Sequence, residues 1–547
     1  MKKQVLAILM AAATGVAAFG ACTRRPVDGE DGEDYSGKTV LNIGNYDGGI
    51  GHDWLDATAA RFEEAYKDWV NPEDPEKVGV KVKVTNKKSP FQTTALNNNI
   101  PYDNLDIYFT NIAYDAGVKA GVFYNITDWI EEKIFDTDGE LASLTGNTAV
   151  RSVLDTMDAR WQPNYNVSKQ EGKNEYYAIP YYYSVGGAWF DGDLFDSKGL
   201  YFGEDGQLGL SWAQHRHLLS KGPDGVKGTY DDGQPATMEQ FVELLDYMIT
   251  VGVTPFTWSA TNLYQRTSVL TAMLVNYLGK EAAQKLWTEN GISPIIESDG
   301  MKAAIALAEL LGKNGTKYVS EKAFTSNSHT GAQEEFIYSK ESSSPIGIFL
   351  EFSWWESEIR QGFNDMGSYS EADGYGKRNF RLMCMPNFSA ADETKYGVPA
   401  KTMERQTIFA ENSYNAVVVS SYTKQPLLTK MFLQFNQQRS ELVSYAAHSS
   451  CFRPFEYLEN ITEEEYSTCT KMVQNVLDLM KQDTTDVVIA ELWSDKLKNN
   501  FDLLRNLPFH ALMPMEVKEP ISYFYNNTSK TAAEYIAGIS AFYAQRY

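Results

Sequence analysis

The sequence predicts an α/β protein built from two lobes. The chain has 547 residues, which is more than one hydrophobic core usually holds, so two large lobes are the default expectation. Predicted strands alternate with predicted helices near the N-terminal end, a pattern typical of a parallel sheet with helices on both faces. Hydrophobic residues make up 43% and charged residues 22% of the chain, as in globular proteins that fold around a core.

The first lobe opens as strand, helix, strand and strand. Residues 38–44 (KTVLNIG) are apolar enough for a buried strand. Apolar residues then recur at steps of four and three from Leu55 to Trp69, which predicts a helix with one apolar face. Residues 78–84 alternate valine with glycine or lysine, as in a strand with one buried face. The segment 105–109 (LDIYF) is the next predicted strand.

Two loops follow the carboxyl ends of these strands, at residues 45–53 and 110–114. In parallel sheets, ligands bind beyond the carboxyl ends of the strands. We therefore expect binding groups in both loops. The candidates are Asp47, His52 and Asn111, with the backbone amides of Gly48 and Gly49, because glycine lets a backbone approach a ligand closely. The alternative is that the glycines only form a turn.

Capping signals predict several later helices. The capping boxes are Thr237 with Gln240, Thr462 with Glu465, and Thr531 with Glu534. Residues 301–312 and 426–447 are also helical by the period of their apolar residues.

The N-terminal segment predicts export and lipid anchoring. A basic start is followed by an apolar run, and Gly20-Ala21 precedes Cys22, as in a signal peptide before its cleavage point. Residues 1–21 are predicted to be a lipoprotein signal peptide and Cys22 the lipidated residue, although Phe19 departs from the usual leucine. A plain secretory signal with a chance cysteine is the alternative. Residues 22–37 are acidic and without apolar period, so they predict a flexible tether.

Charge and cysteine usage exclude several classes of protein. The formal net charge is −23, which repels nucleic-acid phosphates and anionic lipid headgroups. We therefore expect no nucleic-acid partner, and membrane contact through the lipid anchor only. Beyond Cys22 the chain has Cys384, Cys451 and Cys469, too few for a disulfide scaffold in an exported protein of this size. One disulfide pair remains open.

Five stretches, taken in order, resemble family 1 extracellular solute-binding proteins, the class that includes the maltodextrin-binding proteins. They are NYDGGIGHDWLDATAARFEE from residue 45, YAIPYYYSVGGAWFDGDLFDSKGL at 177–200, TMEQFVELLDYMITVGVTPFTW at 237–258, IGIFLEFSWWESEI at 346–359 and SYNAVVVSSYTKQPLLTKMFLQF at 413–435. Each motif alone is loose, but their order together with the lipoprotein signal is specific.

The resemblance implies a two-lobed, type II periplasmic-binding-protein-like fold with a hinge and an interlobe cleft. It implies crossings between lobes at residues 177–184 and about 383–388. Lobe 1 would contain residues 38–180 and 383–450, and lobe 2 residues 181–382 and 451–547. The implied function is a monomeric, lipid-anchored receptor on the outer face of the cell membrane or in the periplasm, which passes an oligosaccharide to the permease of an ABC importer.

Aromatic residues in the matching stretches are the expected sugar platforms, because a sugar ring has an apolar face and a polar edge. Trp354 lies in the segment that supplies a stacking aromatic in the family, with Trp355 undecided. The other aromatic candidates are Trp54, Tyr181, Tyr183 and Trp258. For each of them, packing in a core is the alternative. Arg453 is expected either to face the cleft or to cap a helix.

An acidic loop suggests a structural metal. Residues 222–233 (GPDGVKGTYDDG) place Asp224, Asp231 and Asp232 among glycines, and calcium takes several oxygen ligands at flexible geometry. The spacing differs from that of an EF-hand loop, and an exposed acidic turn is the alternative. Some sugar-binding relatives carry a structural calcium in a comparable loop. No other cofactor is expected.

Catalytic motifs are missing from the sequence. There is no G-x-S-x-G, and Ser421-Tyr-Thr-Lys424 matches S-x-x-K without its companion motifs. His215 and His217 are the only close histidine pair and lack further zinc ligands. We therefore expect a receptor and not an enzyme. A receptor for a peptide or another small solute, and a lipid-anchored glycoside hydrolase, are the alternatives.

Overall fold

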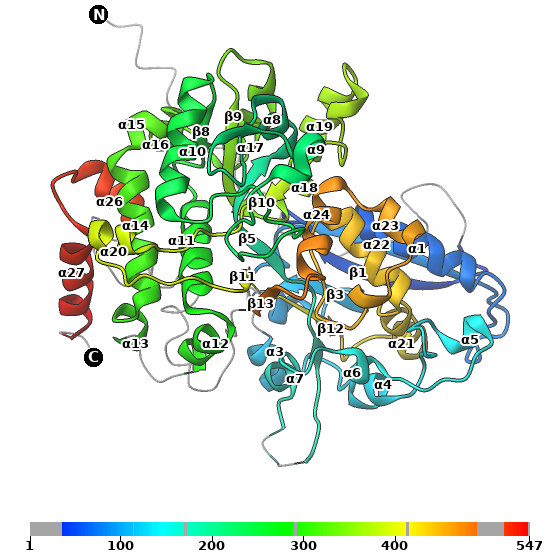
Figure 1. The fold of residues 1–547 in the computed structure, drawn as a ribbon. Helices are drawn as coiled ribbons and strands as arrows, with labels where there is room; N and C mark the ends of the chain where they lie inside the picture. The colour runs from blue at the N-terminus through cyan, green and yellow to red at the C-terminus, as the bar shows by residue number, and fades with distance from the viewer. Residues whose placement is uncertain are drawn as a thin grey trace, which may run out of the picture.

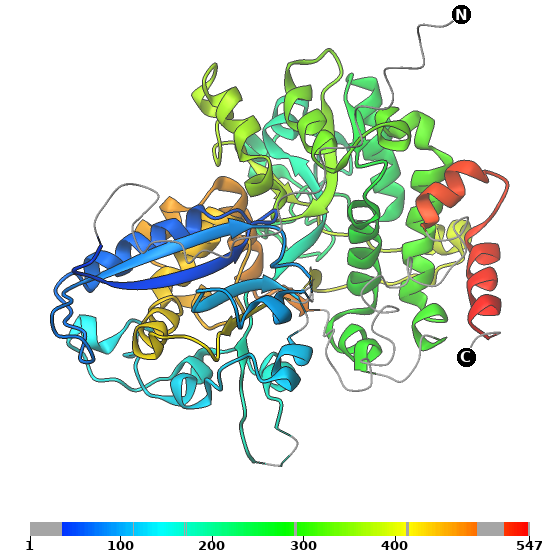
Figure 2. The same cartoon turned by 180° about the vertical axis from the view of Figure 1, so that it is seen from behind.

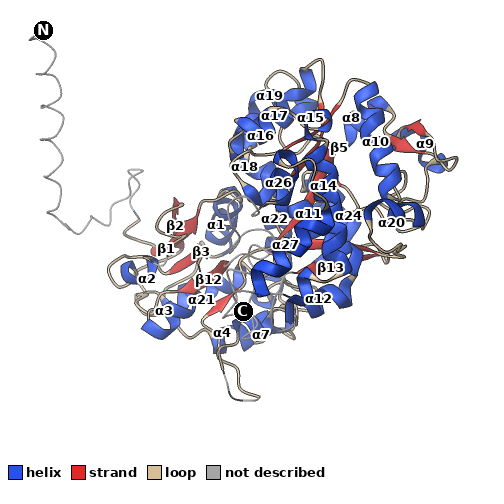
Figure 3. Ribbon diagram, turned by 90° about the vertical axis from the view of Figure 1, so that its left-hand side faces the viewer, coloured by secondary structure: helices blue, strands red, loops and turns tan. Residues whose placement is uncertain are grey.

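The computed structural model describes residues 35–544 except 94, 113, 169, 171, 289–292, 412–414 and 490–518. The predicted signal peptide, Cys22 and the tether up to residue 34 lie outside the described residues. Two lobes lie side by side, each containing a sheet covered by helices (Figure 1; Figure 3). No helix in the described part of the chain is long and apolar enough to cross a membrane.

The first lobe contains a five-stranded sheet. Its elements before the first crossing are β1 (Thr39–Tyr46), α1 (Asp53–Ala65), β2 (Val80–Lys87), α2 (Leu96–Asn99), β3 (Ile107–Asn111), α3 (Asp115–Ala120), α4 (Thr127–Glu131), α5 (Ala142–Thr145), α6 (Val153–Thr156), α7 (Gln162–Tyr165) and β4 (Ala178–Ile179). Those from later in the chain are β12 (Asn415–Val419), α21 (Pro426–Phe435), α22 (Arg439–Ser449), η4 (Leu458–Asn460) and α23 (Glu463–Thr468).

The strand order of this sheet is β2-β1-β3-β12-β4. β1 pairs in parallel with β2 and β3, whereas β12 runs antiparallel to β3 and β4. A strand from the second half of the chain therefore completes the sheet that the N-terminal part begins.

The second lobe contains a six-stranded sheet of order β13-β11-β5-β9-β8, with β10 also paired to β5. Its elements are β5 (Ser184–Asp191), α8 (Gly192–Lys198), β6 (Tyr201–Phe202), β7 (Leu208–Leu210), α9 (Trp212–His215), η1 (Arg216–Leu218), α10 (Met238–Thr250), β8 (Thr254–Thr257), α11 (Leu263–Leu278), α12 (Lys280–Thr288), α13 (Ser293–Ile296), α14 (Asp299–Lys313), α15 (Gly315–Tyr318), α16 (Lys322–Thr325), α17 (His329–Tyr338), η2 (Ser339–Glu341), β9 (Ile346–Phe352), α18 (Trp355–Glu358), α19 (Arg360–Gly367), η3 (Glu371–Asp373), β10 (Phe380–Leu382), α20 (Ala390–Tyr396), β11 (Gln406–Glu411), α24 (Lys471–Met480), β13 (Thr485–Ile489), α26 (Pro520–Asn526) and α27 (Ala532–Ala544). Figure 2 shows α26 and α27, in red, on the second lobe.

The chain passes between the lobes at different places from some of those expected. It leaves the first sheet after β4 and enters the second at β5. The expected second crossing at 383–388 is wrong, because β11 lies beyond it and pairs with β5 and β13 of the second sheet. The return crossing lies between β11 and β12. The chain then stays with the first lobe past residue 450, since α23 packs against α22.

The predicted helix signals correspond to observed contacts. In α1 the buried residues are Trp54, Leu55, Thr58, Ala59 and Phe62, which form one face. Thr237 caps α10 by accepting a hydrogen bond from the Gln240 amide, and Thr462 forms a complete capping box with Glu465. The predicted helix 426–447 is wrong as one helix: it is divided into α21 and α22.

A buried ion pair joins β5 to the segment before β10. The Arg378 guanidinium contacts the Asp191 carboxylate, and both side chains are almost fully buried. Asp191 also caps α8 by accepting from the Leu194 amide.

We predict that Asp191→Asn lowers the free energy of unfolding by about 3–5 kcal/mol, because it leaves the Arg378 charge buried without a partner. The substitution keeps a side-chain oxygen that can cap α8, so the loss of stability measures the removal of the Asp191 charge. Urea denaturation measures it. Glu64→Gln, which removes an exposed pair with Lys67, is the control and should change stability far less, because solvent screens the pair. Equal effects of the two variants would contradict the prediction.

Candidate functional site

The loop between β1 and α1 is one part of the first lobe that contacts the second. It turns at Gly51, whose φ is +67°, and the Gly51 amide donates to the Gly48 carbonyl at 3.0 Å. A positive φ is strained for residues with a Cβ. The glycines therefore do form a turn, which carries residues 47–50 to the junction of the lobes.

Three contacts join this loop and the start of α1 to the segment 354–360. A Cβ added to Gly49 would lie 2.9 Å from Cδ1 of Trp354, so only glycine fits there without a shift. The Ser357 hydroxyl donates to the Ile50 carbonyl at 3.2 Å. Arg360 forms an ion pair with Asp53. The loop 45–53 and the end of β9 therefore form one surface contributed by both lobes.

Trp354 and Trp355 have different environments at this junction. The Trp354 ring is partly exposed and stacks on Phe352, with ring centroids 4.8 Å apart and planes at 24°. Trp355 is fully buried and packs edge-on against Phe349 and Phe380. Of the two, Trp354 is the one that keeps accessible ring surface at the junction.

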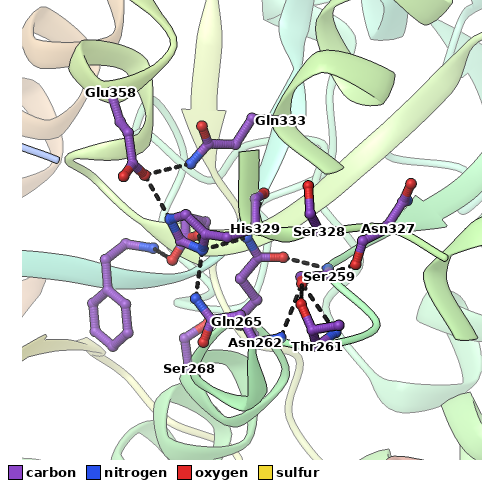
Figure 4. Close-up of polar contacts among 12 residues, drawn as sticks. Ser259, Thr261, Asn262, Gln265, Ser268, Asn327, Ser328, His329, Gln333 and Glu358 are labelled. Carbon is purple, nitrogen blue, oxygen red and sulfur yellow. Dashed lines mark hydrogen bonds and ion pairs between the residues drawn. The ribbon is translucent and has the colours of Figure 1, made fainter. Parts of the chain in front are cut away.

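A polar network lies at the ends of β8 and β9 (Figure 4). His329, the first residue of α17, contacts a Glu358 oxygen through Nε2 at 2.6 Å, and its Nδ1 lies 3.8 Å from a Glu351 oxygen. Gln265 donates to Glu351 at 2.7 Å. Gln333 donates to Glu358 at 2.8 Å. Two carboxylates therefore flank one imidazole, and amide groups fix all three.

Burial and charge set the protonation of this network. Burial raises the pKa of Glu351, which is fully inaccessible to solvent, to about 7. Burial alone would lower the pKa of His329, but the hydrogen bond to Glu358 and the charge of Glu351 raise it overall. Burial would raise the pKa of Glu358, but His329 holds it below its usual range. His329 and Glu358 thus form an ion pair next to a carboxyl group that titrates near neutral pH.

The polar candidates from the first lobe lie at its edge. Asp47 and His52 are partly exposed and contact each other, with His52 Nδ1 3.5 Å from Asp47 Oδ1. Asn111 ends β3, is half-buried and pairs in register with Asn415 of β12. Ligand contact by these residues stays a prediction.

Five other candidates lie in the interior, where their side chains offer no surface to a ligand. These are Trp54, Tyr181, Tyr183, Trp258 and Arg453, each 4% exposed or less. Trp54 points into the first lobe and packs against Phe109 and Tyr445. Trp258 packs edge-on against Phe324. In this conformation they have the stated alternative, core packing, and ligand contact by them stays a prediction.

Of the other interior candidates, Tyr181 and Tyr183 lie in the crossing segment between β4 and β5, and Arg453 follows α22. The Tyr181 hydroxyl donates to Asn45 Oδ1 at 2.9 Å, and Tyr183 stacks on Phe452 at 5.7 Å. Arg453 is buried and caps a helix, as the stated alternative had it: its guanidinium donates at 3.1 Å to the carbonyl of Asn436, the C-cap of α21, and lies over the Trp54 and Tyr445 rings, 4.8 and 4.2 Å from the centroids. All of these partners belong to the first lobe, so the contacts fix the segment after β4 to that lobe.

Sequence reasoning missed His329, Glu358 and Glu351. The two glutamates belong to the matching stretch 346–359, but they appeared there as ordinary polar positions. The signal for His329 was the polar run Thr325–Ser328 directly before a helix start, a place where side chains gather at the end of a sheet. Its pairing with Glu358 depends on tertiary contact and has no local signature.

The three carboxylates of the acidic loop 222–233 are buried, although residues 225–228 of the loop are exposed. Asp224, Asp231 and Asp232 are 3%, 1% and 0% exposed. One oxygen each of Asp224 and Asp232 is buried without a hydrogen-bond partner. Burial and the Asp224 charge raise the pKa of Asp231 to about 7. These oxygens have the chemistry that calcium prefers, so the donor set fits the ion, and calcium here stays a prediction.

Another group of metal-ligand atoms lies at the start of α1. Among the described residues, His52, Asp53 and Asp56 are the group whose ligand atoms lie within 4.8 Å of one another. Asp53 is already paired with Arg360, and all three side chains are 41–53% exposed. These side chains are therefore better explained by solvent exposure and by the contact of Asp53 with the second lobe than by a metal site.

No protein-family model matches the sequence, and no curated protein resembles it in sequence. Solved structures resemble it in fold. A protein from Caldanaerobius polysaccharolyticus, described in work on xylan utilization, has a TM-score of 0.54 at 11% identity and covers 93% of this chain and 100% of its own. A probable secreted solute-binding lipoprotein from Streptomyces coelicolor has a TM-score of 0.53 at 11% identity, with coverage of 92% and 98%. A chitin oligosaccharide binding protein has a TM-score of 0.51 at 11% identity, with coverage of 93% and 98%.

The chain has the two-lobed, type II fold of solute-binding proteins. This likeness over most of the chain confirms the predicted fold class. At 11% identity it shows the fold alone, so the ligand has to be argued from the junction itself.

Stability should fall as pH rises from about 4.5 to 7. The pKa of Glu351 is raised in the folded chain, so its ionisation opposes folding above pH 4.5. The raised pKa of His329 acts in the same direction, because its stabilising charge is lost as pH rises. Glu351→Gln should flatten this fall by up to about 1.4 kcal/mol per pH unit, measured by calorimetry between pH 5 and 8. Exposed Glu334→Gln is the control, and an unchanged slope in Glu351→Gln would contradict the assignment.

Calcium removal tests the acidic loop. We predict that a chelator lowers the melting temperature of the chain and that added calcium, but not added sodium at equal ionic strength, restores it. Asp232→Asn should abolish the calcium response. Asp205→Asn, at an exposed acid outside the loop, should keep it. A melting temperature that changes with neither chelator nor calcium would contradict a calcium site and would indicate that protonation alone compensates the buried carboxylates.

Proposed function

We propose that this chain is a lipid-anchored receptor that captures an oligosaccharide between its lobes and delivers it to the permease of an ABC importer. Cys22 would carry the lipid on the outer face of the membrane or in the periplasm, and residues 23–37 would be the tether. The chain would act as a monomer and as a receptor, not as an enzyme.

The observation that carries the proposal is the partly exposed Trp354 ring beside a dense set of polar groups. Its stack on Phe352 fixes the ring plane, so it is preorganised as a platform for the apolar face of a sugar. Hydroxyl groups at the edge of a sugar need both donors and acceptors. Glu358 and Asn262, both partly exposed and both in contact with His329, are the polar groups of this kind on the same lobe.

The first lobe supplies the groups that would close over a ligand bound at Trp354. Loop 45–53 approaches Trp354 through Gly49, and it brings the Asp47 carboxylate and the Gly48 amide to the same junction. A ligand on Trp354 would gain further contacts when this loop closes over it. Closure needs such contacts, because a ligand shifts an equilibrium only by binding one state better than the other.

The comparisons agree with a sugar as the ligand. One protein of similar fold binds a chitin oligosaccharide and another is a probable solute-binding lipoprotein. Their sequences are too distant to transfer a ligand, so the argument rests on Trp354. A peptide ligand would be favoured by a charged site without an aromatic platform, and a hydrolase would release product.

Titration calorimetry and thermal shift of the chain from residue 23 onward, against oligosaccharides and peptides, test the proposal. An oligosaccharide at a hundred times its dissociation constant should add about 2.7 kcal/mol of stability. Trp354→Ala should weaken its binding by about 2 kcal/mol, roughly thirtyfold in the dissociation constant.

The control is Tyr102→Ala, which removes a ring that is 88% exposed and lies away from the junction; binding should be unchanged. A response to peptides alone would overturn the substrate class while keeping a receptor. Release of shorter sugars on long incubation would overturn the assignment as a receptor.

A further inference from the structure

A cavity lies in the second lobe between segment 202–236, β10 and α24. Its volume is about 150 Å³, enough for a small solute or several waters. The lining residues are Trp212, Arg216, Tyr230, Asn379, Arg381, Asn475, Asp478 and Gln482. None of them belongs to the junction around Trp354, so this cavity is separate from the proposed sugar site.

Arg381 is a buried charge that lacks a carboxylate partner. It is 3% exposed, and no ion pair within 4.0 Å involves it among the described residues. Its guanidinium donates to the Tyr230 carbonyl and lies 3.9 Å from the Trp212 ring centroid, while its buried Nε has no hydrogen-bond partner. Buried charges in proteins are normally paired.

Other buried arginines of the chain show which kind of partner Arg381 lacks. Arg378, three residues earlier, is paired with Asp191. Arg266 is paired with Glu519 at 2.9 Å. Arg453 has no carboxylate either and, like Arg381, lies over aromatic rings, but it does not line this cavity. Arg381 alone of these four combines an unpaired charge with a place on the wall of a cavity that the structure describes.

A second guanidinium converges on the same cavity. Arg216 lies with its guanidinium 4.7 Å from the Trp212 centroid and also has no ion pair within 4.0 Å in the described part of the chain. The Trp212 ring is thus covered by cations and not free to stack on a sugar. Asp478 lines the cavity as well, where it accepts hydrogen bonds from the Tyr466 hydroxyl at 3.0 Å.

Amide groups add to the donors. Gln482 accepts from the Tyr230 amide through its side-chain oxygen at 3.1 Å, which leaves its NH₂ group as a donor. Asn475 donates to Asn379 and to the Phe380 carbonyl, both at 2.8 Å, so the wall is fixed in position. Two guanidinium groups with neutral donors are the usual recognition set for an oxyanion.

We propose that this cavity binds a small oxyanion, either inorganic phosphate or the phosphate or carboxylate group of a small solute, with Arg381 and Arg216 as its ligands. A bound oxyanion would neutralise the buried Arg381 charge. It would also tie segment 202–236, through Trp212 and Arg216, to the turn after α24, through Gln482.

Isothermal calorimetry of the chain from residue 23 onward with inorganic phosphate, in chloride buffer of constant ionic strength, tests the proposal. One phosphate should bind per chain. Arg216→Ala should weaken binding about tenfold or more without loss of fold, because Arg216 is exposed. Arg381→Gln should abolish binding. Lys227→Ala, at a nearby cation paired with Glu204 and outside the cavity, is the matched control and should bind as the parent does.

Parallel titrations with glucuronate, glucose 6-phosphate and glucose distinguish the sources of the oxyanion. Tighter binding of a sugar acid or sugar phosphate than of inorganic phosphate identifies a group on a solute, and the reverse identifies the free ion. Binding of none of the anions, or phosphate binding that Arg216→Ala leaves unchanged, would overturn the proposal. Equal binding of uncharged glucose would also overturn it.

Discussion

The close approach of the loop after β1 to Trp354 is the constraint on which the junction of the lobes depends. Residue 49 has room for a hydrogen and not for a methyl group. Because the backbone passes so near the indole, the Ile50 carbonyl reaches Ser357 and Asp53 reaches Arg360. The same approach leaves Trp354 partly exposed between two lobes that both present polar groups, which is the arrangement a shared ligand needs.

Buried ionisable groups concentrate in the second lobe and at its border with the first. Burial raises the pKa values of Glu351, Glu356 and Asp231 to about 7. Each opposes folding when ionised, so none is explained by stability alone. Places where a sequence departs from local rules of burial are commonly functional. Here they correspond to three separate features: the network beside Trp354, the contact of Glu356 with Ser450 and Thr470, and the acidic loop.

The sequence predicted the fold class well and the crossings less well. Apolar period located α1, and the alternating valines located β2, because both signals are local. The return crossing was predicted too early in the chain. β11 belongs to the second sheet because it pairs with β5, and no local pattern in residues 383–411 predicts which strand β11 pairs with.

For the candidate site, residue type was a poor guide to exposure. Trp54, Trp258 and Trp354 all follow plausible loop or strand ends, yet two are core residues. Their burial depends on partners far along the chain, such as Tyr445 against Trp54 and Phe324 against Trp258. The acidic loop was recognised from composition, but its burial comes from tertiary contacts, including that of Asn387 with the Pro223 carbonyl at 2.6 Å.

The distance between the lobes is the most direct test of capture at the junction. Spin labels at Tyr102→Cys in the first lobe and Tyr369→Cys in the second use side chains that are 88% and 93% exposed, while the native thiols of Cys384, Cys451 and Cys469 are buried. Electron–electron double resonance should show one distance distribution without ligand and a shifted, narrower one with a saturating oligosaccharide, and Trp354→Ala should keep the first distribution at the same sugar concentration. A sugar that binds tightly and leaves the distribution unchanged would contradict closure of the lobes around it.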